Sequence, residues 1–196
     1  MPESASQQGS ASSWRVVIDR VRTTFWPPQA PDHVPSPGLT TEEDRLRRLD
    51  RVRDLLEQTR ASLLQHGWTR GAWFDVADAQ GRIRPVGAAE ASTLLGPGRR
   101  VSGACVVGAM LRLVEDPDSA PSVADAWGCV DELHEAMHER MGHTSFPPGR
   151  IYSHDQRRVR LQALTAWNDE SGRRLEDVLD LIDRAVARTM VGACRV

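Results

Sequence analysis

The sequence predicts a mainly α-helical protein, a compact bundle of five or six helices with one β-hairpin and a flexible N-terminal arm. Three observations predict this class. Apolar residues recur three and four positions apart along several long segments, which is the spacing of a buried helix face. Residues 71–86 have instead the pattern of two short strands around a turn. Proline and small polar residues dominate the first 39 positions, a composition that does not form a packed core.

The composition makes some classes of function unexpected. The formal net charge of −2 is close to neutral, so broad electrostatic attraction to nucleic acid or to an anionic membrane is not expected. All 25 basic residues are arginine, which we interpret as codon bias of a GC-rich genome. The 196 residues suffice for one domain with its own core.

The cysteines and the N-terminus indicate a cytoplasmic protein. The three cysteines are odd in number and form no Cys-x-x-Cys pair, so we expect reduced thiols. The first 13 residues have no basic region followed by an apolar one, and we therefore expect no secretory signal. No segment is apolar for long enough to cross a bilayer, which predicts that the protein has no membrane partner.

The domain organisation follows from the proline content. Residues 1–39 form the predicted disordered, Pro-rich arm, and residues 40–193 form a single helical domain. Within the arm, residues 14–26 place Trp14, Val17, Ile18 and Val21 at helical spacing. This short amphipathic segment either docks on the domain through its tether or docks on a partner.

The domain begins with a long helix over about residues 41–66. Residues 40–43 have the form of a capping box, and Gly67 is a natural helix stop. A β-hairpin follows, with arms at 71–76 and 82–86, and Pro85 restricts its second arm to a sheet edge. A short helix is expected at 87–95.

The most apolar stretch, residues 101–115, is the predicted central helix. Eight successive residues from Ala104 to Leu111 carry no charge, which suits a helix buried on every side. Ser102 is the expected N-cap. Gly108 and Ala109 are small enough to let other backbones approach closely.

Three more helices complete the bundle. The first runs from a Ser122 cap to about Met141, and Met141 belongs to its inward stripe. The second covers 156–167 and is capped by Asp155. A loop at 168–172 leads into the last helix, for which Ser171 or Asp169 must supply the cap because Arg174 cannot.

Three blocks of this sequence resemble a known family: residues 66–72 (HGWTRGA), 105–109 (CVVGA) and 167–173 (WNDESGR). The family comprises small actinobacterial and actinophage proteins classed as a domain of unknown function, with Gly-Trp-x-x-Gly-Ala, Trp-Cys-Ala-Leu-Gly-Ala and Trp-Asn-Asp-x-x-Gly-Arg-Thr blocks. The resemblance spans about residues 46–187 and implies no activity. Two positions depart from it, since Ala104 stands for the family's tryptophan and Arg174 for its threonine.

One motif carries possible metal chemistry. His134, Glu135 and His138 have the His-Glu-x-x-His spacing of a zinc helix, in which two histidines bind the metal and the glutamate polarises its water. A third ligand is required, and the nearest choices are His143, His154 and Asp155. The alternative is a partly buried His134 bonded to a neighbour such as Asp131. We expect no third ligand close enough and a solvent-facing Glu135.

Cys105 is the second candidate, because a helix N-terminus lowers the pKa of a thiol. A histidine from 134–154, with Asn168 or Asp169, would complete a catalytic arrangement around it. The alternatives are a Cys105 that is a small buried apolar residue and an Asn168-Asp169 pair that stabilises a turn.

The predicted function is a small cytoplasmic binding or accessory protein that acts without a cofactor on an unknown protein or small-molecule partner. The alternatives are a zinc-dependent hydrolase built on Glu135 with His134, His138 and His143, and a cysteine-dependent enzyme built on Cys105; the sequence leaves open whether it is an enzyme. A basic cluster at Arg150, Arg157, Arg158 and Arg160 is the one local patch that could bind phosphate or nucleic acid, although such clusters are usually solvated helix faces.

Overall fold

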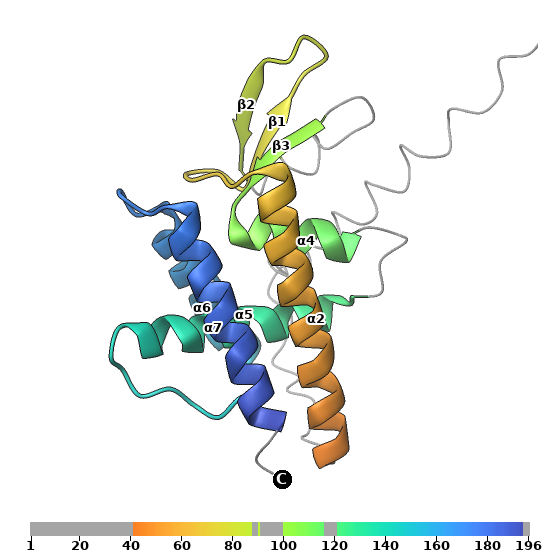
Figure 1. The fold of residues 1–196 in the computed structure, drawn as a ribbon, viewed down its shortest axis with the longest axis vertical. Helices are drawn as coiled ribbons and strands as arrows, with labels where there is room; N and C mark the ends of the chain where they lie inside the picture. The colour runs from red at the N-terminus through yellow and green to blue at the C-terminus, as the bar shows by residue number, and fades with distance from the viewer. Residues whose placement is uncertain (1–40, 88–89, 91–99, 116–120, 194–196) are drawn as a thin grey trace, which may run out of the picture.

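The computed structural model describes residues 41–87, 90, 100–115 and 121–193 (Figure 1). Within them the chain forms five helices and a small three-stranded sheet, which confirms the predicted helical class. The arm at 1–39 and almost all of the short helix predicted at 87–95 lie outside the described residues. The elements, in chain order, are α2 (Glu42–His66), β1 (Phe74–Ala77), β2 (Ile83–Val86), β3 (Arg100–Ala104), α4 (Val106–Glu115), α5 (Val123–Arg140), α6 (His154–Asp169) and α7 (Leu175–Ala193).

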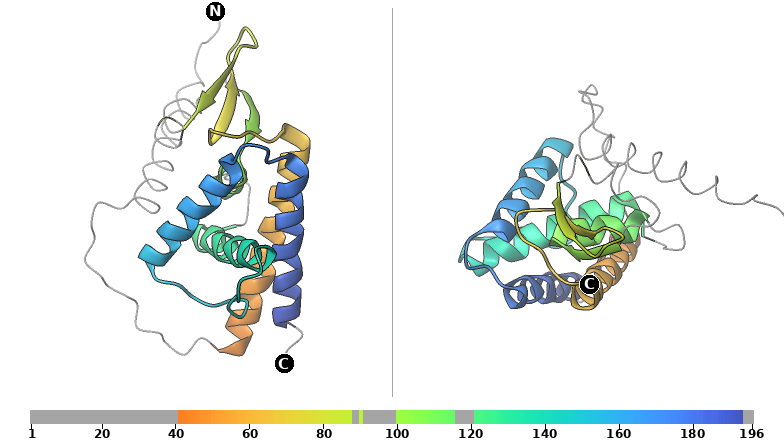
Figure 2. Two further views of the ribbon diagram at one scale, coloured as in Figure 1. Left: turned by 90° about the vertical axis from the view of Figure 1, so that its left-hand side faces the viewer. Right: turned by 90° about the horizontal axis from the view of Figure 1, so that it is seen from above.

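The first long helix, α2, begins with a capping box one residue later than predicted. Thr41 is the N-cap: its hydroxyl accepts the N–H of Asp44, and the Asp44 carboxylate accepts the N–H of Thr41. Gly67 ends the helix with a φ of 95°, and a Cβ there would lie 2.9 Å from the carbonyl oxygen of Ser102. α7 lies alongside α2 in the views of Figures 1 and 2.

The predicted hairpin is present, but the sheet has a third strand that the sequence pattern did not predict. β1 lies between β2 and β3 and pairs antiparallel with both. Residues 101–104 therefore belong to a strand, and the helix predicted for 101–115 was wrong in its first part. Ser102 caps nothing; its hydroxyl donates to the carbonyl of Asp75 where the β1–β3 register shifts. The physical reason is that β1 presents an unpaired edge, which this segment covers.

α4 is the central helix, and it starts at Val106. Its apolar residues are almost completely enclosed between the sheet and the other helices: Val106, Val107, Ala109, Met110 and Leu111. Gly108 permits the closest approach in this core, because a Cβ there would lie 2.4 Å from the carbonyl oxygen of Trp73. The short α4 thus touches the chain that leads into β1.

Local caps define the remaining helices. Ser122 caps α5 as predicted, through a capping box with Asp125. α6 is capped by Ser153 rather than Asp155, so Asp155 lies in its first turn. Before α7, the N–H of Arg174 is bonded by the carboxylate of Asp177 from the first turn, which replaces the predicted Ser171 or Asp169 cap.

α5 crosses the α2–α7 pair and is buried on most of its circumference (Figure 2). Of its predicted inward stripe, Trp127, Val130, Leu133 and Met137 are buried, whereas Met141 lies beyond the end of the helix and is exposed. The helix also buries four carboxylates, which the apolar stripe did not predict: Asp125, Asp131, Glu132 and Glu135. In the described part of the chain, no helix has the length and apolar character that a bilayer span requires.

Candidate functional site

The segment after α2 is fastened to the end of α6 by Asn168. The indole N–H of Trp68 donates to Oδ1 of Asn168 at 2.8 Å, and Nδ2 of Asn168 donates to the carbonyl of Thr69 at 3.3 Å. Asn168 is fully buried and lies in the last turn of the helix, not in the predicted loop. Its amide therefore acts as an internal clamp between two segments.

Asp169 extends this clamp toward the surface. Its Oδ1 accepts the N–H of Gly71 at 2.9 Å and Nδ2 of Asn168 at 2.8 Å. Behind it, the guanidinium of Arg173 stacks on the ring of Trp167 at 3.8 Å and donates to the Trp167 carbonyl. In the block at 167–173, the side chains of Asn168, Asp169 and Arg173 thus each have a structural partner.

The same segment after α2 also joins the start of α4. The N–H of Thr69 donates to the carbonyl of Ala104, whose own N–H donates to the carbonyl of Gly67. The N–H of Cys105 donates to the carbonyl of Trp73 at 3.0 Å. The three sequence blocks at 66–72, 105–109 and 167–173 therefore meet in one junction.

Cys105 occupies the N-cap position of α4. Its Sγ accepts the N–H of Gly108 at 3.3 Å, and the side chain is only 1% exposed. Burial raises the pKa of the thiol to about 12, which outweighs the backbone hydrogen bonds that favour the thiolate. A thiol in this state is a poor nucleophile at neutral pH.

Of the three histidines in the predicted metal site, His134 and His138 lie in the last turns of α5, and His143 lies three residues beyond its end. The ring centroids of His134 and His138 are 4.3 Å apart, and those of His138 and His143 are 5.6 Å apart. His134 is buried and its Nδ1 has no hydrogen-bond partner, so the predicted bond to Asp131 does not form. Burial, with the charge of Arg160, lowers the pKa of His134 to about 4. Across the described ranges, no three His, Cys, Asp or Glu side chains are arranged to hold a metal ion.

Glu135 is buried, and the expectation that it faces solvent was wrong. Only 3% of the residue is exposed, because α6 and the segment before it cover this face of α5. The carboxylate accepts the hydroxyl of Tyr152 at 2.8 Å, the N–H of Phe146 at 2.8 Å and the guanidinium of Arg160 at 2.5 Å. Burial disfavours its charge, but these donors together hold its pKa below the ordinary value. With three donors, Glu135 is not free to activate a metal-bound water, and these residues do not fit a catalytic zinc site.

The predicted basic cluster is divided between the interior and the surface. Arg157 pairs with Asp131 at 2.7 Å, and Arg160 pairs with Glu135. The positive charges of these two guanidinium groups are therefore balanced by neighbouring carboxylates. Arg158 lies on the outer face of α6, 3.9 Å from Asp155. Arg150 stacks over the ring of Phe146 at 4.0 Å.

Charged side chains from three helices also bond the main chain between α5 and α6. We call residues 144–150 the proline loop, since it contains Pro147 and Pro148. Five charged side chains from α2, α5 and α7 bond its backbone: Glu135 accepts the N–H of Phe146, Glu132 accepts the N–H of Gly149, and Arg188, Arg45 and Arg48 donate to the carbonyls of Phe146, Pro148 and Gly149. A loop held in this way has little freedom to change its conformation.

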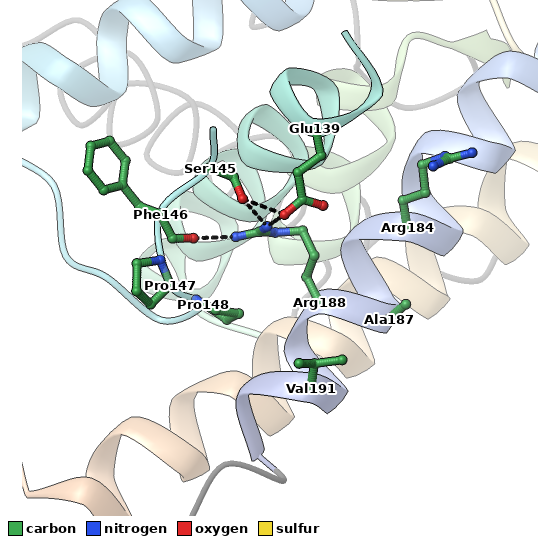
Figure 3. A pocket seen from close by; sticks show the side chains of 9 residues that line it. All are labelled: Glu139, Ser145, Phe146, Pro147, Pro148, Arg184, Ala187, Arg188 and Val191. Carbon is green, nitrogen blue, oxygen red and sulfur yellow. Dashed lines mark hydrogen bonds and ion pairs between the residues drawn. The ribbon is translucent and has the colours of Figure 1, made fainter. Parts of the chain in front are cut away.

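A groove of about 510 Å³ lies between the proline loop and α7 (Figure 3). We call it the proline groove; its walls are residues 145–148, Glu139 of α5, and Arg184, Ala187, Arg188 and Val191 of α7. Arg188 forms its floor and reaches toward Glu139, Ser145 and the carbonyl of Phe146. The backbone carbonyl of Phe146 faces the groove, whereas its ring points away from it and lies under Arg150 (Figure 3). Pro147, Ala187 and Val191 line the groove and are exposed, Val191 by 49%.

The profile of DUF6197, a family of unknown function, matches residues 47–188. The chain belongs to this family. The match includes all three blocks of the junction as well as the proline loop, and ends at Arg188. No curated protein and no solved structure matches the chain.

No sequence pattern predicted the groove of this DUF6197 protein. Its key cation, Arg188, lies three residues after Ala185 and six after Ile182, both of which are fully buried on α7. An arginine on the apolar face of a helix was the available signal, because a buried cation needs an acidic partner. The partners Glu132 and Glu139 come from a different helix, and no local pattern connects them to Arg188.

Proposed function

We propose that this DUF6197 protein is a cytoplasmic binding or accessory protein, without a metal cofactor, whose proline groove takes an apolar segment of another protein. One observation carries the proposal. The main chain of the proline loop is bonded by charged side chains from three helices, while Pro147, Ala187 and Val191 remain exposed along the groove.

Preorganisation is the physical reason that this arrangement suits binding. A flexible loop loses conformational entropy when a partner orders it, and that loss weakens binding. In the proline loop this ordering is already provided by Glu132, Glu135 and Arg188. Exposed apolar groups such as Val191 on such a frame contribute favourably to binding, because their surface is removed from water without further ordering of the loop.

The chemistry of the other candidates supports binding over catalysis. Cys105 is buried at a helix cap, and Glu135 is held by three donors. Asn168 and Asp169 bond the segment after α2. Each of these side chains thus has a structural task, and no observation favours a particular reaction.

Affinity capture with matched variants tests the proposal. The full chain, Ala187→Asp and Val191→Asp, two exposed positions of α7 that line the groove, would each be immobilised and exposed to lysate from cells that produce the protein. Ile83→Ser is the control, because Ile83 is 63% exposed on β2, away from the groove. Proteins recovered by the full chain would be purified and their dissociation constants measured by calorimetry.

We expect a partner that binds the full chain and Ile83→Ser alike and loses at least tenfold in affinity with both groove variants. Circular dichroism would verify that all variants remain folded. Equal recovery of every protein by all four forms would contradict the proposal, since binding would then be independent of the groove.

A further inference from the structure

We infer that Arg48, Arg51 and Arg157 form a binding site for a phosphate group where α2 crosses α5. None of the three side chains lines the proline groove, so the inference goes beyond the proposed function and concerns a second ligand of different chemistry. Arg157 is the one member of the predicted basic cluster that belongs to this site.

Arg48 is a partly buried cation to which the fold gives no carboxylate. Its Nη2 donates to the carbonyl of Gly149 at 2.6 Å, and no acidic side chain of the described residues pairs with it. The guanidinium groups of Arg157, Arg160 and Arg188, by contrast, each pair with a carboxylate. A carbonyl supplies only a dipole, so the positive charge of Arg48 is not balanced within its own hydrogen bond.

Two acids of α5 hold Arg51 and Arg157 close to Arg48. Arg51 of α2 pairs with Asp125 at 3.0 Å, and Arg157 of α6 pairs with Asp131 at 2.7 Å. The two acids are six residues apart on one helix, which is a rise of about 9 Å. The two guanidinium groups are therefore separated by a short stretch of α5.

Arg48 lies at this same stretch. α2 crosses α5 where Val52 meets Gly128, midway between the two acids. Arg48 precedes Val52 by four residues, about one turn, and so lies on the same side of α2. The residue that it bonds, Gly149, is also held by Glu132 of α5. The three arginines therefore gather at one crossing of helices.

The electrostatic environment of Arg48 is positive. Burial, together with the charges of Arg157, Arg45 and Arg51, lowers the pKa of Arg48, and the charge of Asp131 opposes this shift without cancelling it. The Asp131 carboxylate is buried and bonded by Arg157, so it leaves the solvent side of the cluster to a ligand. A bound anion would supply the missing negative charge.

The available donors suit a phosphate better than a carboxylate. In its ion pair Arg51 uses only Nε, and Arg157 uses Nε and Nη2, so both retain N–H groups without a partner in the described part of the chain. The three oxygens of a phosphate can accept from separate guanidinium groups, whereas one guanidinium satisfies the two oxygens of a carboxylate. The Arg51 side chain is 56% exposed, so a ligand can enter from solvent.

NMR of the arginine side chains in the full chain tests the inference. The Nε–H signals of protein labelled with ¹⁵N-arginine would be followed during titration with inorganic phosphate at constant ionic strength, and with acetate as the carboxylate probe. Arg48→Gln removes the cation without a carboxylate, and Arg51→Gln removes a second donor at an exposed side chain. Arg53→Gln is the control, because Arg53 pairs with Asp50 and Asp54 of its own helix. Circular dichroism would verify that each variant is folded.

We expect saturable shifts with phosphate and a dissociation constant that rises roughly tenfold or more in Arg48→Gln and Arg51→Gln, since each loses charged hydrogen bonds to the ligand. Arg53→Gln should bind like the unmodified chain. Arg48→Lys, which keeps the charge but not the planar donors, should bind with intermediate strength. Shifts that only increase linearly with phosphate, or one affinity for all variants, would overturn the inference. Acetate bound as tightly as phosphate would also overturn it, since the ligand would then be a carboxylate.

Discussion

The indole nitrogen of Trp68 and the amide oxygen of Asn168 lie 2.8 Å apart and form a hydrogen bond, although the two residues are 100 positions apart in the chain. Asn168 also donates to the carbonyl of Thr69 from a fully buried position. A buried amide with its partners in place stabilises one arrangement strongly, because any other leaves polar groups without water or protein. The pair therefore fixes how the end of α6 meets the segment after α2.

Asn168→Ala should lower the free energy of unfolding. The substitution leaves the Trp68 N–H and the Thr69 carbonyl without partners, and buried polar groups in that state cost roughly 1 to 3 kcal/mol each. Urea denaturation followed by circular dichroism measures the change. Gln162→Ala, at an exposed position of the same helix, is the control and should change the value by less than about 0.5 kcal/mol. Equal effects of the two substitutions would show that the amide is not the clamp.

Cys105 should resist alkylation in the folded protein. Burial raises the pKa of its thiol to about 12, so at pH 7 hardly any thiolate exists to react. Cys105→Ser should be tolerated within about 1 kcal/mol, because serine is a good N-cap and its oxygen can accept the N–H of Gly108. Iodoacetamide labelling with peptide mass spectrometry, in buffer and in denaturant, measures the reactivity. Fast, selective labelling of Cys105 in buffer would restore the cysteine enzyme as a hypothesis.

Glu135→Gln should destabilise the fold through Arg160. Removal of one partner from a buried ion pair typically costs about 3 to 5 kcal/mol, because the other charge remains buried without compensation. Glu176→Gln is the matched control on an exposed position of α7. Chelators should leave the melting temperature of the unmodified chain unchanged. One zinc ion per chain in protein purified without a His-tag, measured by mass spectrometry, would contradict the assignment of Glu135 as structural.

His134 and Asp131 should change the free energy of unfolding in opposite directions as the pH changes. Burial lowers the pKa of His134 to about 4, so its contribution to stability is present above pH 6.5 and is lost as the pH falls toward 4. Burial raises the pKa of Asp131 to about 6 despite its pairing with Arg157, so its contribution is present below pH 3.8 and is lost as the pH rises toward 6. Between pH 4 and 6 the two groups oppose each other.

His134→Asn should therefore gain stability relative to the unmodified chain as the pH falls from 6.5 to 4, by roughly 3 kcal/mol. Asp131→Asn should lose stability relative to the unmodified chain over the same range. Urea denaturation at half-unit pH steps measures both. Parallel pH profiles for the three proteins would show that neither group titrates differently in the folded and unfolded states.

Local signals predicted most of the helical fold. The Ser122 cap of α5 and the Gly67 stop of α2 depend on side chains and dihedral angles within one helical turn, and both are where the sequence placed them. Residues 101–104 were predicted as helix because their apolar character alone does not distinguish a buried helix from a strand. These residues form a strand because they pair with the free edge of β1, which lies about 25 residues earlier in the chain.

In the candidate site too, local sequence patterns predicted individual segments but not the long-range contacts between them. The blocks at 66–72, 105–109 and 167–173 were identified from the sequence, but the contact between Trp68 and Asn168 could not be, because nothing local specifies a pair so far apart. Glu135 was predicted to face solvent from its angle on a helical wheel. A wheel gives the direction of a side chain around the helix axis, but it does not show which other segments cover that face. Burial of that face depends on the proline loop, whose own position depends on Arg45, Arg48 and Arg188 from two other helices.

Deletion of residues 1–38 should leave a folded domain with slightly lower stability. The capping box at Thr41 and the whole described core remain, so circular dichroism should retain the helical signal. Loss of a docked segment should lower stability by on the order of 1 kcal/mol, which for a domain of this size corresponds to about 2 to 4 °C in the melting temperature. Thr41→Ala in the full chain is the companion variant: it removes the cap and should cost about 1 kcal/mol through α2 itself. Since the two losses have separate origins, they should add when the changes are combined. A truncated protein without helical signal would instead place residues 14–26 in the core, and the tethered arm would then be the wrong description.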